Sequence, residues 1–186
     1  MKRFFDILLA VTLIILFLWL IILIAISIKS TSKGPVIYWS SRVGINNRIF
    51  KMPKFRSMNI DTPDIATHLM SDPKAYLSPL GGFLRSYSLD ELPQLFSVLK
   101  GDMSFVGPRP ALHNQDDLIA LRKKKGVCRL IPGITGWAQV NGRDDLSILD
   151  KVDLDFEYMN TRSIWFDLKI LWLTFLKVLG RNNVSH

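Results

Sequence analysis

The sequence has one cysteine among its 186 residues, which excludes an intramolecular disulfide and a cysteine-rich zinc site. Histidine is also rare, and the three histidines, His68, His113 and His186, have no spacing typical of metal ligands. The sequence contains no phosphate-binding P-loop, no G-x-G-x-x-G dinucleotide fingerprint and no G-x-S-x-G nucleophile elbow. These absences argue against the enzyme classes that depend on those motifs.

Acidic residues are the minority among the charges: 16 Asp and Glu stand against 24 Lys and Arg, for a formal net charge of +8. A basic chain favours an anionic partner, and nucleic acid, anionic lipid and a nucleotide-sugar all qualify. The apolar N-terminus favours an anionic lipid bilayer, so we expect no nucleic-acid partner. Whether the chain forms a homo-oligomer is left open.

Proline is absent from the long apolar run Phe4–Ile28, which only Asp6, Thr12 and Ser27 interrupt. A helix rises about 1.5 Å per residue, so this run is long enough to cross a bilayer. It predicts a membrane-embedded helix over residues 1–30, and no convincing signal-peptide cleavage site follows it. The helix either spans the membrane or re-enters on the same face, and nothing local forces the kink that re-entry needs.

The segment after this helix is strongly basic, with Arg42, Arg48, Lys51, Lys54 and Arg56. By the positive-inside tendency, this predicts that a catalytic domain over residues 31–186 faces the cytosol.

The rest of the chain predicts an α+β fold that is mostly helical. Short strands are expected at Val36–Trp39 and Ile49–Met52, joined by a turn at Gly44–Asn47 into a small β-hairpin. Helices are expected at Leu80–Arg85, Leu89–Leu99, Asn114–Lys125, Leu149–Asn160 and Ile164–Leu179. The last is apolar with interrupting Trp and Lys residues, so it suits an amphipathic helix in the membrane interface or ordinary core packing.

Two adjacent carboxylates, Asp90 and Glu91, stand in an apolar stretch of the sequence. Such a pair needs a metal ion, a cationic group or solvent to be stable. Ser88 and Glu91 match a capping box, but Pro93 fits better with a helix that begins near Asp90. Asp90 then lies in a first helical turn, which favours ionised carboxylate and bound phosphate. Asp90 can attack phosphorus, and Glu91 can hold Mg²⁺.

Two arginines are placed to contact a phosphate. Phosphoryl transfer needs positive groups around the phosphate oxygens, and arginine makes bidentate contacts that lysine cannot. Arg85 precedes Asp90 by five residues, and Arg109 stands between Pro108 and Pro110.

Other charged groups have two interpretations each. Arg56 is a further candidate phosphate ligand, or its positive charge attracts the protein to an anionic membrane surface. Arg143 ends the Gly-rich block that starts at Pro132, which is either a ligand loop or a tight turn. Asp153-Leu-Asp155 fits the Asp-x-Asp pattern of metal-dependent glycosyltransferases, but such pairs are common on helix surfaces. The basic run Arg122–Lys125 suits a helix C-terminus that faces solvent or lipid.

Three blocks carry a family resemblance: Ser88–Leu95, Gly101–Pro110 and Pro132–Arg143. Together they resemble the signature of the bacterial sugar transferases, the monotopic phosphoglycosyl transferases that load a sugar phosphate onto polyprenyl phosphate. The resemblance runs from about Lys2 to about Lys177. One departure is that the family's Ser-Pro break in the N-terminal helix is missing, where this chain reads about Phe17–Trp19.

The resemblance implies the site and its chemistry. It assigns Asp90 as the nucleophile, Glu91 and Asp167 as acids near Mg²⁺, and Arg85 and Arg109 as phosphate contacts. It implies a UDP-sugar and polyprenyl (undecaprenyl) phosphate as substrates at the bacterial inner membrane, with UMP as product.

 The sugar is expected to be an acetamido-deoxy sugar, and the reaction would be the first membrane step of glycoconjugate assembly.

Two rival functions follow from the same residues. A membrane-tethered basic adaptor would explain the net charge and the apolar segments, but it does not explain the acid pair or the turn Gly107–Pro110. An inactive relative that serves as a scaffold is the other, and the intact acid pair argues against it. Mg²⁺-dependent release of UMP discriminates the enzyme from both.

Overall fold

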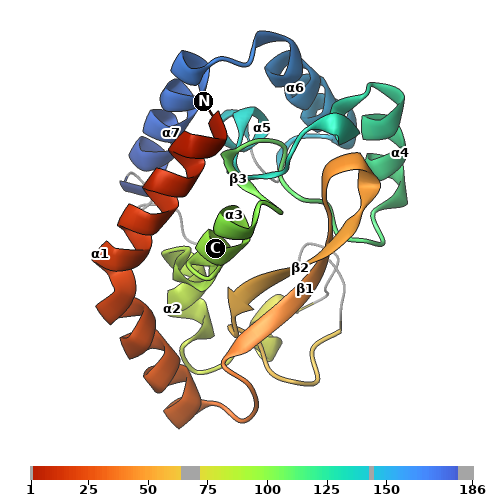
Figure 1. The fold of residues 1–186 in the computed structure, drawn as a ribbon. Coiled ribbons are helices and arrows are strands. Elements are labelled where there is room, and N and C mark those ends of the chain that lie inside the picture. Colours follow the sequence, from red (N-terminus) through yellow and green to blue (C-terminus); the bar gives the residue numbers. More distant parts are fainter. Residues whose placement is uncertain (1, 64–71, 143–144, 180–186) are drawn as a thin grey trace.

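The computed structural model describes residues 2–63, 72–142 and 145–179. One long helix, α1 (Lys2–Thr31), lies along one side of the molecule, and the remaining elements form a globular part beside it (Figure 1). The described chain is mostly helical with two small sheets, which confirms the predicted α+β class. The division into residues 1–30 and 31–186 stays a prediction, although α1 ends close to that boundary.

Helix α1 is continuous over 30 residues, because its apolar side chains include no proline or glycine that would interrupt it. Among the described residues it is the one helix long and apolar enough to cross a membrane, by length and composition alone. Many of its large apolar side chains are exposed, including Phe4, Ile15 and Trp19. Its outer surface therefore resembles that of a helix in contact with lipid.

The N-terminal end of α1 is bonded to the globular part. Three charged residues of its first two turns make these contacts: Lys2 to Asp167 at 2.5 Å, Arg3 to the Leu99 carbonyl at 2.6 Å and Asp6 to the Ser104 hydroxyl at 2.9 Å. Asp6 is buried and also accepts a hydrogen bond from the backbone N–H of Phe105. A buried charge needs such partners, so these contacts fix this end of the helix against the globular part.

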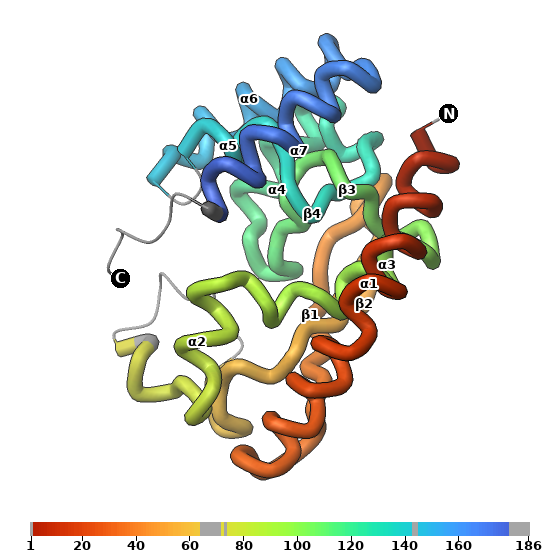
Figure 2. Tube along the Cα trace, turned by 90° about the vertical axis from the view of Figure 1, so that its left-hand side faces the viewer, coloured from red at the N-terminus to blue at the C-terminus, as the bar shows by residue number. Residues whose placement is uncertain are grey.

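The C-terminal end of α1 packs against the same globular part. Ile24 and Ile28 are buried in a small core with Phe55 and Leu84. Figure 2 shows α1 running alongside α3 (Gln94–Lys100) between these two ends. Both ends of the apolar helix thus contact one folded unit.

The predicted β-hairpin is confirmed. Strands β1 (Ile37–Val43) and β2 (Ile49–Phe55) are antiparallel, and both are longer than the sequence predicted. The turn between them includes the 3₁₀ turn η1 (Ile45–Asn47), where Asn46 and Asn47 have positive φ angles, a conformation that asparagine tolerates. The extra length of β2 places Lys54 on a strand rather than in a loop.

The predicted helix Leu89–Leu99 is wrong at its start. After α2 (Gly81–Ser86), the acid pair lies in a single 3₁₀ turn, η4 (Leu89–Glu91), and α3 begins only after Pro93. Proline cannot donate the N–H that a continuous helix would need here, so the chain breaks into two pieces. Ser88 makes no capping bond and has a φ of 55°. Asp90 therefore does not lie in the first turn of an α-helix, and the expected support from a helix dipole does not apply.

A parallel pair of short strands, β3 (Ser104–Val106) and β4 (Gly133–Thr135), was not predicted. It brings two of the three signature blocks side by side. A Cβ atom at Gly133 would lie 2.2 Å from the backbone nitrogen of Gly107, so glycine is needed for this close approach. The block Pro132–Gly142 consequently forms β4 and the short helix α5 (Trp137–Asn141) rather than a free turn.

The remaining helices pack around these strands. They are α4 (Asp116–Lys124), α6 (Ile148–Thr161) and α7 (Ile164–Leu179). Two short 3₁₀ turns complete the described elements: η5 (Val127–Arg129) follows α4, and η3 (Pro73–Tyr76) precedes α2. The main core includes Val98, Met103, Val106 and Ile170. Because Ile170 is buried while Trp165 and Trp172 are exposed, α7 contributes to the core on one side and presents aromatic side chains on the other.

Candidate active site

Three separate elements bring charged side chains together around the acid pair. Lys54 comes from β2, Asp90 and Glu91 from η4, and Arg109 from the segment after β3. Lys54 Nζ lies 2.8 Å from Glu91 Oε1 and 3.9 Å from Asp90 Oδ2. Arg109 Nη2 lies 3.1 Å from the same Glu91 oxygen. We call these four residues the charged cluster.

The charged cluster is buried at its base and open at its rim. Asp90 is 8% exposed, whereas the side chain of Arg109 is 47% exposed. Charges that are partly removed from water interact more strongly than charges on a flat surface. A phosphate group that reached Arg109 from solvent would therefore meet cations first and the carboxylate of Asp90 behind them.

The two neighbouring carboxyl groups have pKa values shifted in opposite directions. Burial alone would raise the pKa of Glu91, but Lys54 and Arg109 outweigh it and hold that pKa well below its usual value. Burial raises the pKa of Asp90, and Lys54, Arg85 and Arg109 only partly offset it. Divergent pKa values in an adjacent pair are typical of groups with different chemical roles. Glu91 contacts both cations, at 2.8 and 3.1 Å, whereas Asp90 lies 3.9 Å from Lys54.

Arg85 belongs to the surroundings of the charged cluster. It lies in the last turn of α2, and its Nη1 is 3.1 Å from the sulfur of Met58. Its positive charge also lowers the pKa of Asp90 against the effect of burial. The structure thus brings Arg85 and Arg109, both predicted from the sequence, to the acid pair.

Two other predicted site residues, Arg56 and Asp167, make no contact with the charged cluster among the described residues. Arg56 follows β2 and lies near Gly34, and its buried Nε has no hydrogen-bond partner within the described part of the chain. Arg143 lies outside the described residues. Asp167 pairs with Lys2 and accepts a hydrogen bond from the Tyr158 hydroxyl at 2.7 Å. Its role as a metal ligand stays a prediction.

Sequence reasoning missed Lys54 as a site residue. The predicted strand ended at Met52, so Lys54 counted only toward the basic segment after α1. Its importance depends on a contact with Glu91 across 37 positions of the chain, and no local pattern encodes that contact.

The charged cluster fits a divalent cation only in part. Among residues 2–63, 72–142 and 145–179, no three His, Cys, Asp or Glu side chains gather as a metal site. Mg²⁺ is often held by one or two carboxylates together with substrate phosphates, and Asp90 and Glu91 can supply the protein's share. The donor set therefore suits a cation that arrives with a phosphorylated substrate.

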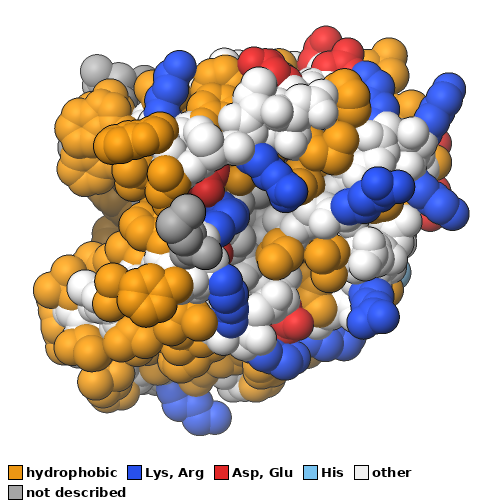
Figure 3. Space-filling view, turned by 45° about the horizontal axis from the view of Figure 1, so that its top comes forward, with side chains coloured by type: hydrophobic (Ala, Val, Ile, Leu, Met, Phe, Trp, Pro, Cys, Tyr) orange, Lys and Arg blue, Asp and Glu red, His pale blue; other side chains and the backbone are white. Residues whose placement is uncertain are grey.

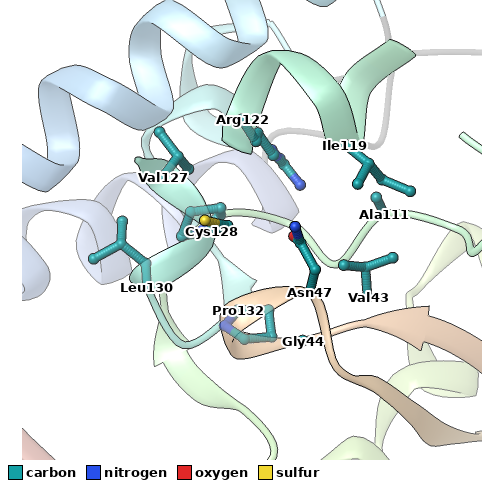
Figure 4. Close-up of a pocket in the computed structure, with 11 residues that line it drawn as sticks. Val43, Gly44, Asn47, Ala111, Ile119, Arg122, Val127, Cys128, Leu130 and Pro132 are labelled. Atoms are coloured by element: carbon teal, nitrogen blue, oxygen red, sulfur yellow. The ribbon is translucent and has the colours of Figure 1, made fainter. Parts of the chain in front are cut away.

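A small cavity of about 30 Å³ is lined in part by Pro108 and Ala111, which flank Arg109 in the sequence (Figure 4). Its lining includes Val43, Arg122, Cys128 and Pro132, and it contains neither Asp90 nor Glu91. This volume is enough for about one water molecule. The cavity is too small for a nucleotide. A ligand of that size would have to reach the charged cluster at the cluster's open rim.

Comparison with known proteins places this geometry in context. The family model described as "Bacterial sugar transferase" matches residues 1–181. An undecaprenyl-phosphate glucose phosphotransferase of Komagataeibacter xylinus is 41% identical over 98% of this chain and 36% of its own length. A UDP-glucose:undecaprenyl-phosphate glucose-1-phosphate transferase of Escherichia coli K12 is 40% identical over 95% of this chain and 40% of its own length.

A third relative is similar in size to this chain. It is the uncharacterized sugar transferase EpsL of Bacillus subtilis, 41% identical over 100% of this chain and 90% of its own length. By contrast, the chain spans about two fifths of the first two relatives, which are larger proteins.

Proposed function

Because this chain belongs to the bacterial sugar transferase family, we propose that it transfers a sugar 1-phosphate from a UDP-sugar to polyprenyl phosphate. The products are UMP and a polyprenyl diphosphate sugar. The observation that carries the proposal is the charged cluster, in which a buried carboxylate, Asp90, lies behind the cations Lys54 and Arg109. Cations around a phosphate and a carboxylate aimed at phosphorus are what this reaction requires.

The first step is attack of an Asp90 carboxylate oxygen on the β-phosphorus of the UDP-sugar. The bond between that phosphorus and the bridging oxygen breaks, and UMP leaves with the bridging oxygen and its electron pair. Asp90 then carries the sugar phosphate as an acyl phosphate. Arg109 and Arg85 orient the phosphate oxygens, while Lys54 and Arg109 hold Glu91 as a carboxylate beside them.

In the second step, an oxygen of polyprenyl phosphate attacks the same phosphorus. The bond between Asp90 and phosphorus breaks, the polyprenyl diphosphate sugar leaves, and the Asp90 carboxylate is restored. Mg²⁺, held by Glu91 with the phosphates, would neutralise negative charge during transfer. We propose Asp167 as a second Mg²⁺ ligand. Because Asp167 pairs with Lys2 in this structure, its side chain would have to move when substrate binds.

The function is tested by measuring UMP release from UDP-sugars with undecaprenyl phosphate and Mg²⁺. UDP-glucose is the first substrate to test because the names of two relatives specify glucose, and UDP-linked acetamido sugars test the expectation from the sequence. Release that depends on both the lipid phosphate and Mg²⁺ supports the proposal. A folded protein that releases no UMP from any of these sugars, and merely binds anionic vesicles, would favour the adaptor instead.

The pH dependence of this reaction should depend on Lys54. Asp90 must be ionised to attack, and its raised pKa places the loss of activity on acidification at a higher pH than for an ordinary aspartate. Lys54 lowers that pKa, so Lys54→Met should move the acid limb of the kcat/KM profile to still higher pH. Lys51→Met on the same strand is the control, since Lys51 bonds to Ser41 at the surface. An acid limb that stays in place, or moves to lower pH, would contradict this assignment.

We also propose that the protein is seated on the inner face of the bacterial cytoplasmic membrane. Hydrophobic side chains gather over α1 and α7 on one side of the molecule, while lysines and arginines are spread over the rest of the view (Figure 3). Exposed Trp165 and Trp172 suit the level of the lipid headgroups. The charged cluster would then face the cytosol, where the UDP-sugar is, and stay near the lipid phosphate.

The contacts at both ends of α1 support a helix that lies along the inner face of the membrane, with both of its ends on that face. The helix is roughly 45 Å long, so a perpendicular span would place Lys2 on the opposite side of the bilayer from the globular part. Lys2 instead pairs with Asp167 of the globular part. The continuous α1 means that same-face placement would come from docking on the globular part rather than from a kink.

Cysteine labelling tests this topology. With Cys128 replaced by serine, a cysteine at Lys2 should react with a membrane-impermeant reagent only from the cytosolic side. A cysteine at Lys33, an exposed position just beyond α1, is the control that reports the side of the globular part. Labelling of the two positions from opposite sides would show a single span and refute the same-face placement.

A further inference from the structure

The segment that carries Arg109 is held by an unusual set of hydrogen bonds. Two of its residues are prolines, which have no backbone N–H to donate. Four successive carbonyl oxygens accept hydrogen bonds from other elements: Pro108 from Gly133 N at 2.9 Å, Arg109 from Arg122 Nη1 at 2.8 Å, Pro110 from Arg42 Nη1 at 3.2 Å and Ala111 from Val43 N at 2.9 Å. The backbone beneath the Arg109 side chain is therefore fixed from several directions.

Arg122 makes the contact nearest to the charged cluster. It lies on α4, and Figure 4 shows its side chain extending into the space between Cys128 and Ala111. Its Nε and Nη2 donate to Asp155 Oδ2 of α6, at 3.0 and 2.6 Å, and its Nη1 donates to the carbonyl of Arg109. The exposed fractions of the two side chains are only 12% and 2%. The sequence predicted that both side chains are exposed at the surface, and this prediction is wrong because both are largely buried.

A buried ion pair is weak support for stability, because apolar residues of similar volume often replace it without loss. What apolar residues could not replace is the hydrogen bond to the Arg109 carbonyl. Asp155 fixes the orientation of the Arg122 guanidinium, and the guanidinium in turn fixes the backbone from which Arg109 reaches Glu91. The path runs from α6 through α4 to the acid pair.

We infer that Arg122 and Asp155 are positioning residues that hold Arg109 in place for phosphate transfer. The inference rests on the proposed transferase function and adds two residues to its machinery. Neither residue touches the reacting phosphate; both act through the backbone of Arg109. A displacement of about 1 Å in a phosphate contact can reduce a rate by about a hundredfold.

The test replaces the pair by apolar residues, Arg122→Met with Asp155→Leu, so that no buried charge is left alone. We expect a folded protein whose kcat for UMP release falls by about tenfold to a hundredfold, with a smaller change in KM. The matched control is Lys125→Met with Asp153→Leu, which removes the exposed ion pair between the same two helical regions. Wild-type kcat in the Arg122 and Asp155 variant would overturn the inference.

A double-mutant comparison separates positioning from a general structural role. In an Arg109→Ala background, the same paired substitution should reduce kcat by less than about twofold, because residues that act through one group are not additive. Losses that multiply fully would show that the pair acts independently of Arg109 and would overturn the inference. If the paired variant does not fold, Asp155→Asn is compared in both backgrounds with the same criteria.

Hydrogen exchange gives a readout that does not depend on turnover. The amide of Val43 donates to the Ala111 carbonyl, so it reports on the order of this segment. Its exchange should be faster in the paired variant than in the wild type and the control, and an unchanged rate would overturn the inference. If the wild-type protein released no UMP, the proposed function would fail, and this measurement alone would decide whether the pair fixes the segment.

Discussion

Replacing Asp90 by asparagine should reduce UMP release by at least about a thousandfold. Asparagine has nearly the same shape, so the fold around η4 should persist, but its amide cannot form an acyl phosphate. Incubation of the wild type with a UDP-sugar alone should leave a sugar phosphate on Asp90 that mass spectrometry detects. The asparagine variant should carry no such adduct.

Asp102→Asn is the matched control for this substitution. Asp102 is partly buried, follows α3 and pairs with Lys100 at 3.0 Å, and Lys100 is not part of the charged cluster. It should retain wild-type kinetics. Near-normal release of UMP by Asp90→Asn would eliminate the covalent mechanism and leave direct transfer between the two substrates as the alternative.

Arg109→Lys should reduce kcat/KM by about a hundredfold although it keeps the positive charge. Lysine presents a single ammonium group and cannot reproduce the planar fork with which arginine contacts a phosphate. The backbone of Arg109 cannot move to compensate, because its carbonyl and those of its neighbours are bonded to other elements. Steady-state kinetics of UMP release measures the effect.

Arg129→Lys on the turn η5 is a suitable control, because Arg129 is exposed. It should behave like the wild type. If Arg109→Lys kept full activity while Arg109→Ala lost it, the position would supply only positive charge, and the directed contact proposed here would be wrong.

The elements that the sequence predicted well are those with strong local signals. The expected helix Ile164–Leu179 has the same bounds as α7, because its apolar pattern is regular and no proline interrupts it. The hairpin was found because two apolar runs flank a turn rich in Gly and Asn. Pro93 signalled a disturbed helix, but the sequence placed the start of α3 too early.

The features that the sequence did not predict depend on distant contacts. Strands β3 and β4 have three residues each, and their pairing joins positions far apart in the chain. The acid pair and Arg109 were identified from their motifs. Lys54 could be identified only from the packing of β2 against η4, which brings it to Glu91. Arg122 and Asp155 resembled surface charges because nothing nearby in the sequence indicates that they are buried together.

The seat of α1 has a consequence for the order of folding. Lys2 is separated from Asp167 by 165 positions, and Asp6 from Ser104 by 98. Helix α1 is therefore synthesised long before the residues that its charged turn bonds to. Contacts between such distant positions require a large loop to close, so they form more slowly than local contacts. We expect α1 to form before the globular part folds, and the docking of its N-terminal turn to be the last step of assembly.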